Sequence, residues 1–497
     1  MHPPTRLQRL KRILYLMPIP LFWLWLQRPW LSTSQDFLTP FENVSMDWRF
    51  QFRGELTAPI NVFYVDLDSF ALNLIGERPW DRAFFADAAS ICFELGKAKA
   101  VGFDFIFSKA AKDSQLVSAD KSASSDYALG RVVRLYSDKI VLGANYSDLR
   151  LEHMFDPSEG RGRYGDFPFI RDGNYDPKIN PYPETPTFPI IGPSWGRLGL
   201  LSSDTQRDAG SVCRWIPLFA EFEGMADSMN ILIGERDWLH LPVQSIQTEG
   251  ASLVLKDKNG GTLDSMPKYT DRIFYNLAIE LALAYYGLDD SAIQRTDTHL
   301  KILAEDATVL IDIPLTDKQD MQINWFSSWH NDELNPRCSM AQLYDHVSDY
   351  YQGTANEKEA ARAFFEKING AIVLIGPVDE SLKDLAPTPF DAQPVPNVGI
   401  YGNALKTMFA GRYIYHVPYW AMVIITLSLT WVLATLGLYT GRNGVLMKST
   451  VLAVFVGYIL MVFVVFAHYE VVLPLVSPVG SAVTTAVLGL VLRIVQE

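Results

Sequence analysis

The sequence predicts an α/β domain, with a mainly parallel sheet flanked by helices, together with transmembrane α-helices. Between about residues 60 and 377, short apolar runs that end in polar residues alternate with amphipathic helical patterns. This alternation is typical of strand–helix–strand units. The C-terminal part of the chain instead contains three long segments without any Asp, Glu, Lys or Arg, which points to a different environment.

The three uncharged segments predict membrane-spanning helices. They cover residues 417–440, 449–467 and 471–492. A helix needs roughly 20 apolar residues to cross a hydrocarbon core of about 30 Å, and each segment is close to or above that length. We therefore predict transmembrane helices at 416–440, 447–468 and 471–493, followed by a short tail at 494–497.

The N-terminus predicts a further anchor. Residues 1–31 combine a basic start with an uncharged run at 13–27, which is also the length of a signal peptide. No Ala-x-Ala-like cleavage site follows, so we favour an uncleaved anchor. If the guanidinium of Arg28 extends toward the headgroups, the span reaches Leu31, and the nearby tryptophans form an interfacial belt.

The positions of Lys and Arg predict the orientation. Basic residues precede the first span, lie between the second and third, and follow the last: Arg6, Arg9, Lys11, Arg12, Arg442, Lys448 and Arg493. Basic residues near spans mark the cytoplasmic side. We expect a multi-pass protein of the bacterial inner membrane with both termini in the cytoplasm and residues 32–415 exported to the periplasm or outside.

The exported segment predicts four parallel strands. A strand at 60–65, a helix at 80–95 and a strand at 100–106 make a βαβ unit, in which the strands run parallel with a right-handed crossover. Two more helix–strand pairs follow, at 126–137 with 139–146 and at 357–368 with 370–377. We also expect a packed helix at 272–288, a hairpin turn at 259–261 and a large loop or insertion at 151–190.

Two of these strands end in aspartates. Asp66 and Asp104 occupy corresponding positions near the ends of successive predicted strands, where open α/β sheets form their ligand crevice. Such carboxylates either bind a ligand or fasten loops by hydrogen bonds, which a buried carboxylate needs in any case. The ligand-binding or loop-fastening candidates are Asp66, Asp68, Ser69, Trp80, Arg82, Asp104 and Asp126.

Several motifs carry a family resemblance. "VFYVDLDSF", "VGFDFIFS", "INWFSSWHND" and "VPNVGIYGNALKTMFAGRYI" occur in this order along the chain. Together they resemble the second class of CHASE domains, extracellular sensory modules associated with cyclases and histidine kinases, which are followed by three membrane spans. The resemblance implies an exported sensor that passes an unknown signal across the inner membrane to a cytoplasmic effector, here absent or on a separate subunit. By position, Gly402, Asn403 and Tyr413 belong to the coupling segment.

Other functions are less well supported by the sequence. The net charge of −13 does not favour nucleic-acid binding. "VDLDSF" superficially resembles the DxD strand of haloacid-dehalogenase-like phosphatases, but Phe70 stands where that pattern has Thr or Val. No Ser nucleophile lies in a Gly-x-Ser-x-Gly setting. A metal site at His330, Asp332 and Glu333, or at Asp66, Asp68 and Asp104, remains a minor alternative. We therefore expect no enzyme activity, no cofactor and no bound metal.

Two questions about partners stay open at this stage. The three predicted C-terminal spans contain no charge, so a transport path is unsupported. A non-catalytic membrane scaffold that binds another exported or membrane protein is the main alternative to a sensor. We expect contact with membrane lipid and with an extracytoplasmic ligand or protein, and either a homodimer or a separate membrane or cytoplasmic signalling partner. Cys92, Cys213 and Cys338 allow at most one disulfide, and three buried thiols are an equal possibility.

Overall fold

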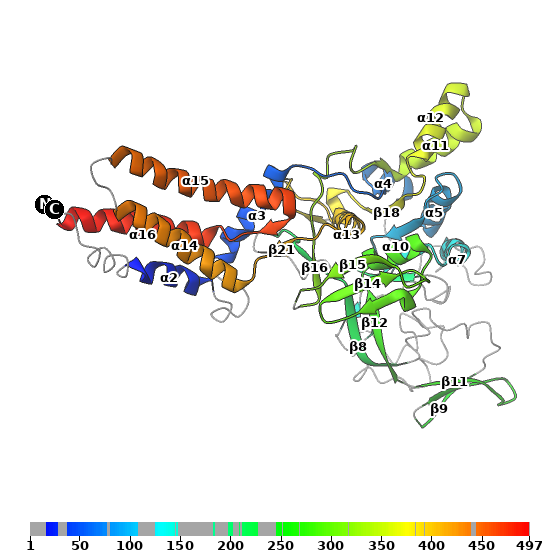
Figure 1. The fold of residues 1–497 in the computed structure, drawn as a ribbon. Helices are drawn as coiled ribbons and strands as arrows, with labels where there is room; N and C mark the ends of the chain where they lie inside the picture. Colours follow the sequence, from blue (N-terminus) through cyan, green and yellow to red (C-terminus); the bar gives the residue numbers. More distant parts are fainter. Residues whose placement is uncertain are drawn as a thin grey trace.

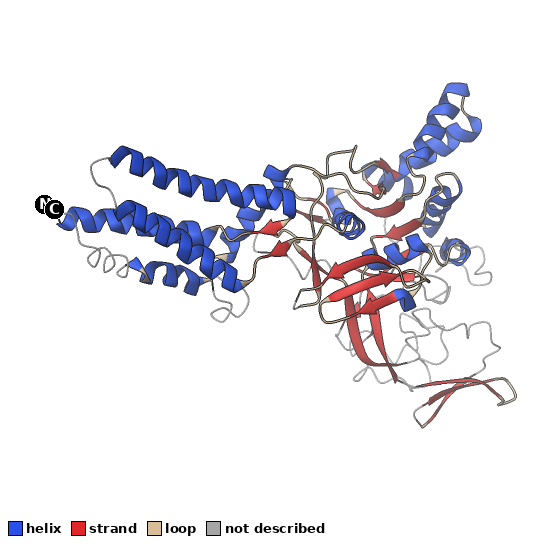
Figure 2. Ribbon diagram, in the orientation of Figure 1, coloured by secondary structure: helices blue, strands red, loops and turns tan. Residues whose placement is uncertain are grey.

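The chain forms an α/β domain attached to an elongated helical bundle (Figures 1 and 2). The computed structural model describes residues 16–27, 37–76, 80–107, 125–144, 146–147, 182–183, 197–201, 208, 211–226, 245–250, 252–267, 269–316, 318–382, 384–391, 393–438 and 444–496. Most of the insertion expected at 151–190 lies outside the described residues, and so do the basic residues before the first predicted span.

The domain is built on a six-stranded sheet. Its strands, in spatial order, are β17 (Arg337–Ser339), β1 (Val62–Leu67), β18 (Ile372–Pro377), β2 (Ala100–Phe103), β3 (Ile140–Ala144) and β6 (Arg197–Leu200). Every neighbouring pair is parallel. The α/β fold with a mainly parallel sheet is therefore confirmed, and the sequence analysis identified four of these six strands.

Helices cover both faces of the sheet, so its strands are buried on both sides. On one face lie α5 (Arg82–Glu94), α7 (Ser125–Leu135), α11 (Met340–Gln352) and α12 (Ala355–Glu366), with side chains that share a core with Phe63, Val65 and Leu67 of β1. On the other face lie α10 (Leu277–Tyr286) and α13 (Val398–Ala410), which share a core with Val62 and Tyr64. Successive side chains of β1 thus pack alternately into two separate cores.

Close backbone approach allows α10 to sit directly on the sheet. A Cβ placed at Gly199 of β6 would lie 2.5 Å from the Cα of Leu277, the first residue of α10. The carboxyl group of Glu280 is buried beneath this helix, 3.2 Å from the guanidinium of Arg197. Burial raises the pKa of Glu280 to about 8, opposed by this guanidinium, so β6 and α10 are joined by a buried polar pair.

Smaller β elements surround this second face. β8 (Phe219–Ala226) pairs with β12 (Tyr269–Tyr275), and β7 (Trp215–Pro217) pairs with β16 (Asp320–Gln322). A separate three-stranded sheet consists of β13 (Ile293–Arg295), β14 (His299–Leu303) and β15 (Val309–Pro314). The remaining strands are β9 (Ser245–Glu249), β10 (Ser252–Lys256), β11 (Thr262–Pro267), β19 (Leu385–Ala386), β20 (Val395–Pro396) and the pair β4 (Tyr146–Ser147) and β5 (Tyr182–Pro183). The hairpin expected at 259–261 is confirmed as the turn between β10 and β11.

The helical bundle consists of α2 (Pro18–Leu26), α14 (Tyr419–Leu438), α15 (Gly444–Tyr469) and α16 (Val476–Gln496), as Figure 1 shows. Within the described residues, one helical stretch, Ser449–Tyr469, is long and apolar enough by composition to cross a membrane. Shorter apolar stretches occur in α14 and α16, at Tyr419–Thr435 and Val476–Leu488. Three C-terminal spans therefore remain a prediction.

Two short elements join the domain to the bundle. α3 (Thr39–Arg53) packs against α15, with the ring of Phe50 5.2 Å from that of Phe466. β21 (Tyr415–His416) pairs in parallel with β22 (Val471–Val472). Because Phe50 and Phe466 belong to the core that covers the α13 face of the sheet, the apolar interior is continuous from the sheet into the bundle.

Two helices begin later in the chain than expected. Residues 272–275 belong to strand β12, and the helix expected at 272–288 begins only after Asn276, whose side chain accepts from the Ala278 N–H. The last helix begins at Val476 rather than 471, because residues 471–472 form a strand and Pro474 follows. The two strands of the predicted βαβ unit are parallel members of one sheet, and β18 lies between them. The three cysteines are free and buried.

Candidate functional site

The two aspartates lie on either side of strand β18. Asp66 is paired in register with Gly376, and Asp104 follows Phe103, whose partner is Ile375. A Cβ placed at Gly376 would lie 3.2 Å from the Cβ of Asp104 and 2.9 Å from Val398, the first residue of α13. The predicted carboxylates thus lie at the same level of the sheet, flanking a glycine against which α13 packs.

Both carboxylates are withdrawn from water. Asp66 is 7% exposed and Asp104 is 6% exposed. Oδ1 of Asp66 is buried without a hydrogen-bond partner among the described residues, and the same holds for Oη of Tyr64 and Nη2 of Arg337. Because Arg337 of β17 is paired in register with Tyr64, these three side chains form one cluster at the carboxyl end of β1. We call Tyr64, Asp66 and Arg337 the strand-end cluster.

One aromatic ring covers the cation of this cluster. The guanidinium carbon of Arg337 lies 4.0 Å from the centroid of the Trp329 ring, and its Nε lies 3.1 Å from Asp332. The Trp329 ring in turn meets Tyr64 edge to face, with centroids 4.9 Å apart. A cation over an indole face is stabilised by the ring quadrupole, most strongly where water is excluded.

Burial alters the protonation of the cluster. It raises the pKa of Asp66 to about 7, an effect that the Arg337 charge opposes and that Asp68 and Asp332 reinforce. Burial also raises the pKa of Tyr64 above its usual range. Burial lowers the pKa of Lys406 on α13 to about 7, and the Arg337 charge lowers it further. Burial thus brings the pKa values of both Asp66 and Lys406 close to neutral pH.

Other predicted site residues fasten loops or fill the opposite core. Asp68 caps α4 (Ser69–Ile75) by accepting from the Ala71 N–H, and its Oδ1 also accepts from the Ser339 hydroxyl at 2.7 Å. The Ser69 hydroxyl donates to Asp379 at 2.5 Å. These bonds tie together the segments that follow β1, β17 and β18, which matches the loop-fastening alternative.

Trp80, Arg82 and Asp126 lie on the other side of the sheet. Trp80 is buried in the core formed by α5 and α7, and Arg82 donates to the Trp80 carbonyl at 3.0 Å and stacks over Phe107. Asp126 lies in α7, and its side chain is outside the described residues. These three residues are therefore not part of the strand-end cluster.

Helix α13 covers the strand-end cluster. A Cβ placed at Gly402 would lie 1.8 Å from the Tyr64 hydroxyl, and one at Gly399 would lie 3.0 Å from the Trp329 ring. Oδ1 of Asn403 accepts from the Phe326 N–H at 2.9 Å. Glycine at 399 and 402 thus lets the two aromatic side chains reach the helix backbone. Of the predicted coupling residues, Gly402 contacts Tyr64 of the site directly, and Asn403 contacts the neighbouring Phe326.

The segment 323–337, which contains "INWFSSWHND", runs along the same helix. Lys406 donates to Oδ1 of Asn335 at 2.6 Å and to the Leu334 carbonyl at 2.8 Å. Oγ1 of Thr407 accepts from the Asn324 N–H at 3.1 Å. Polar contacts therefore hold α13 to this segment along most of its length.

The C-terminal end of α13 leads into the bundle. The helix ends at Gly411 in the left-handed conformation, and Arg412 then forms an ion pair with Glu470 at the end of α15. Nδ2 of Asn324 donates to the Arg412 carbonyl at 2.9 Å. Tyr413, the third predicted coupling residue, is buried, and strand β21 follows it directly. One helix thus spans the distance from the strand-end cluster to the bundle.

The model of the CHASE2 domain matches residues 21–439, from α2 to the end of α14. The chain belongs to the CHASE2 domain family. CHASE2 domains are extracellular sensory domains, and a sensor role is consistent with that membership. Comparisons with curated proteins and with solved structures gave no match.

Part of the site in this CHASE2 domain consists of residues that the sequence pattern does not mark. Tyr64, Trp329, Arg337 and Lys406 are not among the site residues expected from the sequence, although "NPRCSM" places a lone arginine two residues before the Ser339–Gln342 capping box. Because that box predicts a helix start, the arginine two residues earlier falls in the segment that leads into the helix, which here is strand β17. Among the described residues, no group of three or more His, Cys, Asp or Glu side chains is arranged to hold a metal ion.

Proposed function

We propose that this protein is a membrane-anchored extracytoplasmic sensor that transmits its signal through α13 into the membrane helices. The observation that carries this proposal is the continuity of α13. Its first turns cover the strand-end cluster, and the residues after its last turn pair with α15 and with β22. A change at the strand ends that moves α13 therefore acts on the bundle without an intervening flexible linker.

Buried polar atoms without partners make the strand-end cluster responsive to a ligand or a proton. A buried donor or acceptor without a partner costs free energy, of order 1–3 kcal/mol for each group. Oδ1 of Asp66, Oη of Tyr64 and Nη2 of Arg337 are three such atoms. A bound polar ligand or a proton that satisfies them favours one arrangement of the cluster, and only such differential binding can shift a conformational equilibrium.

The membrane side of the proposal rests on composition. α15 meets the length and hydropathy of a span, and α14 and α16 lie beside it in the bundle of Figure 1. With α2 they make a four-helix anchor, with both termini on the cytoplasmic side and the α/β domain outside. The recipient of the signal is a homodimer partner, or a separate membrane or cytoplasmic subunit, and the protein has no catalytic role of its own.

Site-specific labelling tests the topology. Tyr351→Cys introduces a thiol on an exposed position of α11, and Ser449→Cys introduces one at the start of α15. The native thiols are buried. In spheroplasts, we expect a membrane-impermeant maleimide to label Tyr351→Cys, and to label Ser449→Cys only after permeabilisation. Equal labelling of both in intact spheroplasts would contradict the topology.

Reconstitution separates a sensor from a scaffold. Thiol-specific spin labels on the domain side and on the bundle side would report whether the two move together when the pH passes through neutrality. A sensor predicts a coupled change in the mobility of both labels. A scaffold predicts that the bundle-side label does not respond, and that outcome would favour the scaffold over the sensor.

A further inference from the structure

Helix α3 turns apolar side chains outward and charged side chains inward, which is the reverse of a helix on a water-exposed surface. Its outward side chains are apolar and recur every three or four residues, which places them on one face. They are Phe37, just before the helix, and Phe41, Val44, Trp48 and Phe52, with exposed fractions between 47% and 69%. We call this set the α3 apolar face.

The charged side chains of α3 instead point into the protein. Arg49 is fully buried and pairs with Glu42 at 3.3 Å. Asp47 pairs with Arg214 of the domain at 2.8 Å, and Arg53 donates to Oδ1 of Asn324. A helix facing water would turn these groups outward and bury its phenylalanines. The outer side of α3 is therefore suited to an environment other than water.

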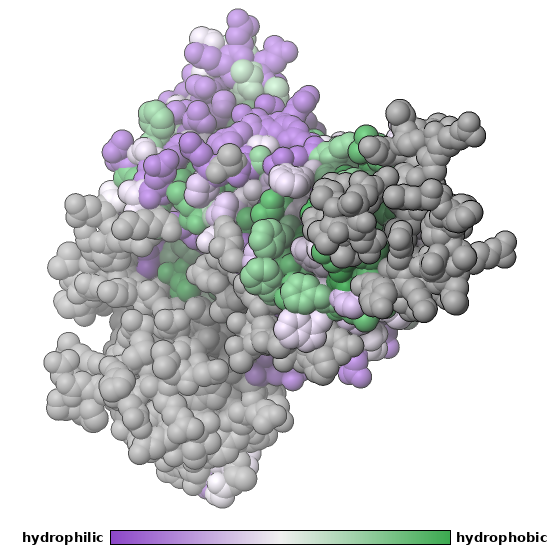
Figure 3. Space-filling view, turned by 90° about the vertical axis from the view of Figure 1, so that its left-hand side faces the viewer, coloured by the Kyte–Doolittle hydropathy of each residue, from purple (hydrophilic) through white to green (hydrophobic). Residues whose placement is uncertain are grey.

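The apolar surface continues from α3 over the bundle. Exposed large apolar side chains occur on all four bundle helices, and they include Leu21, Phe22, Trp25, Trp420, Ile424, Trp431, Leu452, Val456, Leu460, Val464, Val483 and Val487. Figure 3 shows hydrophobic side chains over the bundle and mostly hydrophilic ones over the domain above it. A surface shared among five helices is broader than a single contact with a second copy.

Aromatic side chains gather where the bundle meets the domain. Trp25 lies at the end of α2, Tyr419 and Trp420 at the start of α14, and Tyr469 at the end of α15, and each is at least 40% exposed. These helix ends are on the domain side of the bundle in Figure 1, and the Tyr419 hydroxyl donates to the Leu24 carbonyl of α2 at 3.4 Å. Trp and Tyr are enriched at the level of membrane proteins where the acyl chains meet the headgroups.

We propose that α3 lies in the lipid–water interface on the domain side of the bilayer, with its apolar face among the headgroups and the ends of the acyl chains. This inference rests on the proposed membrane anchoring of the bundle. An interfacial helix buries its apolar face only about 5–10 Å into the bilayer, and a 15-residue helix such as α3 is long enough for that arrangement.

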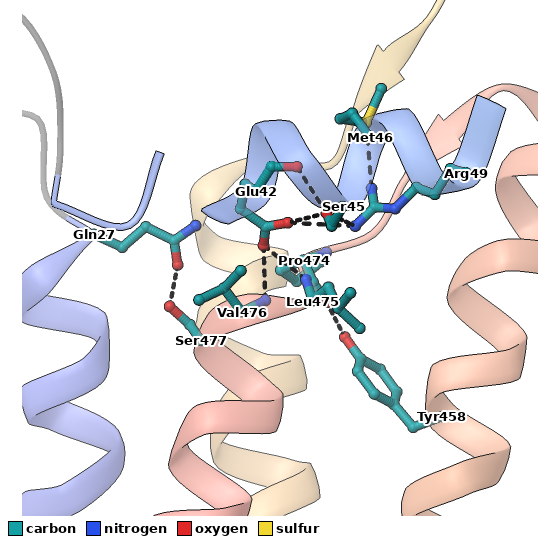
Figure 4. Close-up of polar contacts among 10 residues, drawn as sticks. All are labelled: Gln27, Glu42, Ser45, Met46, Arg49, Tyr458, Pro474, Leu475, Val476 and Ser477. Atoms are coloured by element: carbon teal, nitrogen blue, oxygen red, sulfur yellow. Dashed lines mark hydrogen bonds and ion pairs between the residues drawn. The ribbon is translucent and has the colours of Figure 1, made fainter. Parts of the chain in front are cut away.

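The position of α3 in the interface is transmitted to α16. Oε1 of Glu42 accepts hydrogen bonds from the N–H groups of Leu475 and Val476, at 2.8 and 2.9 Å (Figure 4). These N–H groups lie at the N-terminal end of α16, where a carboxylate satisfies unpaired donors and interacts favourably with the positive end of the helix dipole. A lipid surface that raises or lowers α3 therefore moves the start of α16 with it.

Further contacts hold the same junction. The Tyr458 hydroxyl donates to the Pro474 carbonyl, and the Ser477 hydroxyl donates to the Gln27 side chain (Figure 4). The Ser45 hydroxyl donates to Glu42 at 2.9 Å and accepts from Arg49 at 3.1 Å. Because α2, α3, α15 and α16 all contribute, α3 cannot shift in the interface alone.

Collision accessibility of nitroxide labels tests this inference. The full chain carries Val44→Cys or Phe41→Cys on the α3 apolar face, in bilayers of phosphatidylcholine and phosphatidylglycerol. Leu460→Cys on α15 is the control for the acyl region, and Tyr351→Cys on α11 is the control for water. We expect labels at both α3 positions to collide several-fold more often with oxygen, relative to a water-soluble nickel chelate, than the label at 351 does.

Each other result overturns the inference in a recognisable way. Accessibility at 41 and 44 equal to that at 351 would place α3 in water. Protection of both positions from oxygen and nickel alike would show that protein, such as a second copy of the chain, covers the face. If Leu460→Cys also behaved as in water, the membrane anchoring itself would be wrong, which is a failure distinct from that of α3.

Discussion

The hydroxyl of Tyr64 occupies the space that a side-chain carbon at Gly402 would need, because a Cβ there would lie 1.8 Å from Tyr64 Oη. Tyr64 comes from the second strand of the sheet and Gly402 from the helix that leads to the bundle. The strand-end cluster and α13 are therefore in direct contact, and neither can move far without the other.

Gly402→Ala should destabilise the domain. The added methyl group overpacks the contact with Tyr64, and such overpacking typically costs about 1–3 kcal/mol. Chemical unfolding in detergent measures the change in the free energy of unfolding. Gly457→Ala on α15, where a Cβ meets nothing within 4 Å, is the matched control. Tyr64→Phe in the Gly402→Ala background should recover part of the loss, and the absence of any recovery would argue against this contact.

Asp66→Asn should change how stability depends on pH. The pKa of Asp66 is about 7 in the folded protein, against 3.8 for an unperturbed carboxyl, so the folded state holds this proton more tightly than the unfolded state. The contribution of Asp66 to the free energy of unfolding is therefore most favourable below about pH 4. It declines as the pH rises toward about 7 and stays low at higher pH. At 1.36 kcal/mol per pKa unit, a difference of roughly 3 units corresponds to a decline of about 4 kcal/mol.

The measurement for Asp66 is the unfolding midpoint as a function of pH. The variant should lose the decline between about pH 4 and 7, and it should be more stable than the wild type near pH 8 if its amide fits the site. Asp312→Asn, in an exposed pair with His299, is a control outside the cluster. Identical pH profiles for Asp66→Asn and the wild type would refute the raised pKa.

The ion pair of Arg412 and Glu470 should couple the domain to the bundle. Arg412→Gln and Glu470→Gln each remove one partner, and the double variant completes a mutant cycle. We expect a coupling energy of about 1 kcal/mol, since Arg412 is partly exposed whereas Glu470 is 10% exposed. Additive effects in thermal unfolding would show that the pair contributes nothing to the junction.

Glu42 should be more sensitive to truncation than to amide substitution. Glu42→Ala removes the acceptor for Leu475 and Val476 and leaves Arg49 buried without its counter-charge. Breaking a buried pair in this way typically costs about 3–5 kcal/mol. Glu42→Gln keeps an acceptor oxygen and should cost less. Equal thermal destabilisation by the two substitutions would mean that the α16 contacts are unimportant.

The sequence predicted those parts of the fold that have a local cause. β1, β2, β3 and β18 are mainly apolar runs buried on both faces, interrupted by a charge only at Asp66 of β1, and such runs are the pattern of central parallel strands. β17 and β6 escaped prediction because strands of three and four residues carry too little periodicity. The helix expected from 272 was placed too early, since apolar β-strand and buried helix give similar runs and only Asn276 marks the true start.

The candidate site was only half predictable for a related reason. Asp66 and Asp104 are conspicuous because a charge interrupts an apolar strand, and their common level at the sheet edge follows from parallel pairing. Tyr64, Arg337 and Lys406 come together only through the placement of β17 beside β1 and of α13 over the sheet. No local pattern specifies that placement, because it depends on the whole sheet order.

Hydrogen exchange tests the central claim, that α13 couples the strand ends to the bundle. The full chain in lipid nanodiscs would be compared with its Asp66→Asn variant, peptide by peptide. We predict altered exchange in β21 and β22 and in the first turn of α16, with β13, β14 and β15 unchanged as an internal control for global stability. A change confined to β1, β17 and β18, with the junction identical to that of the wild type, would contradict the coupling.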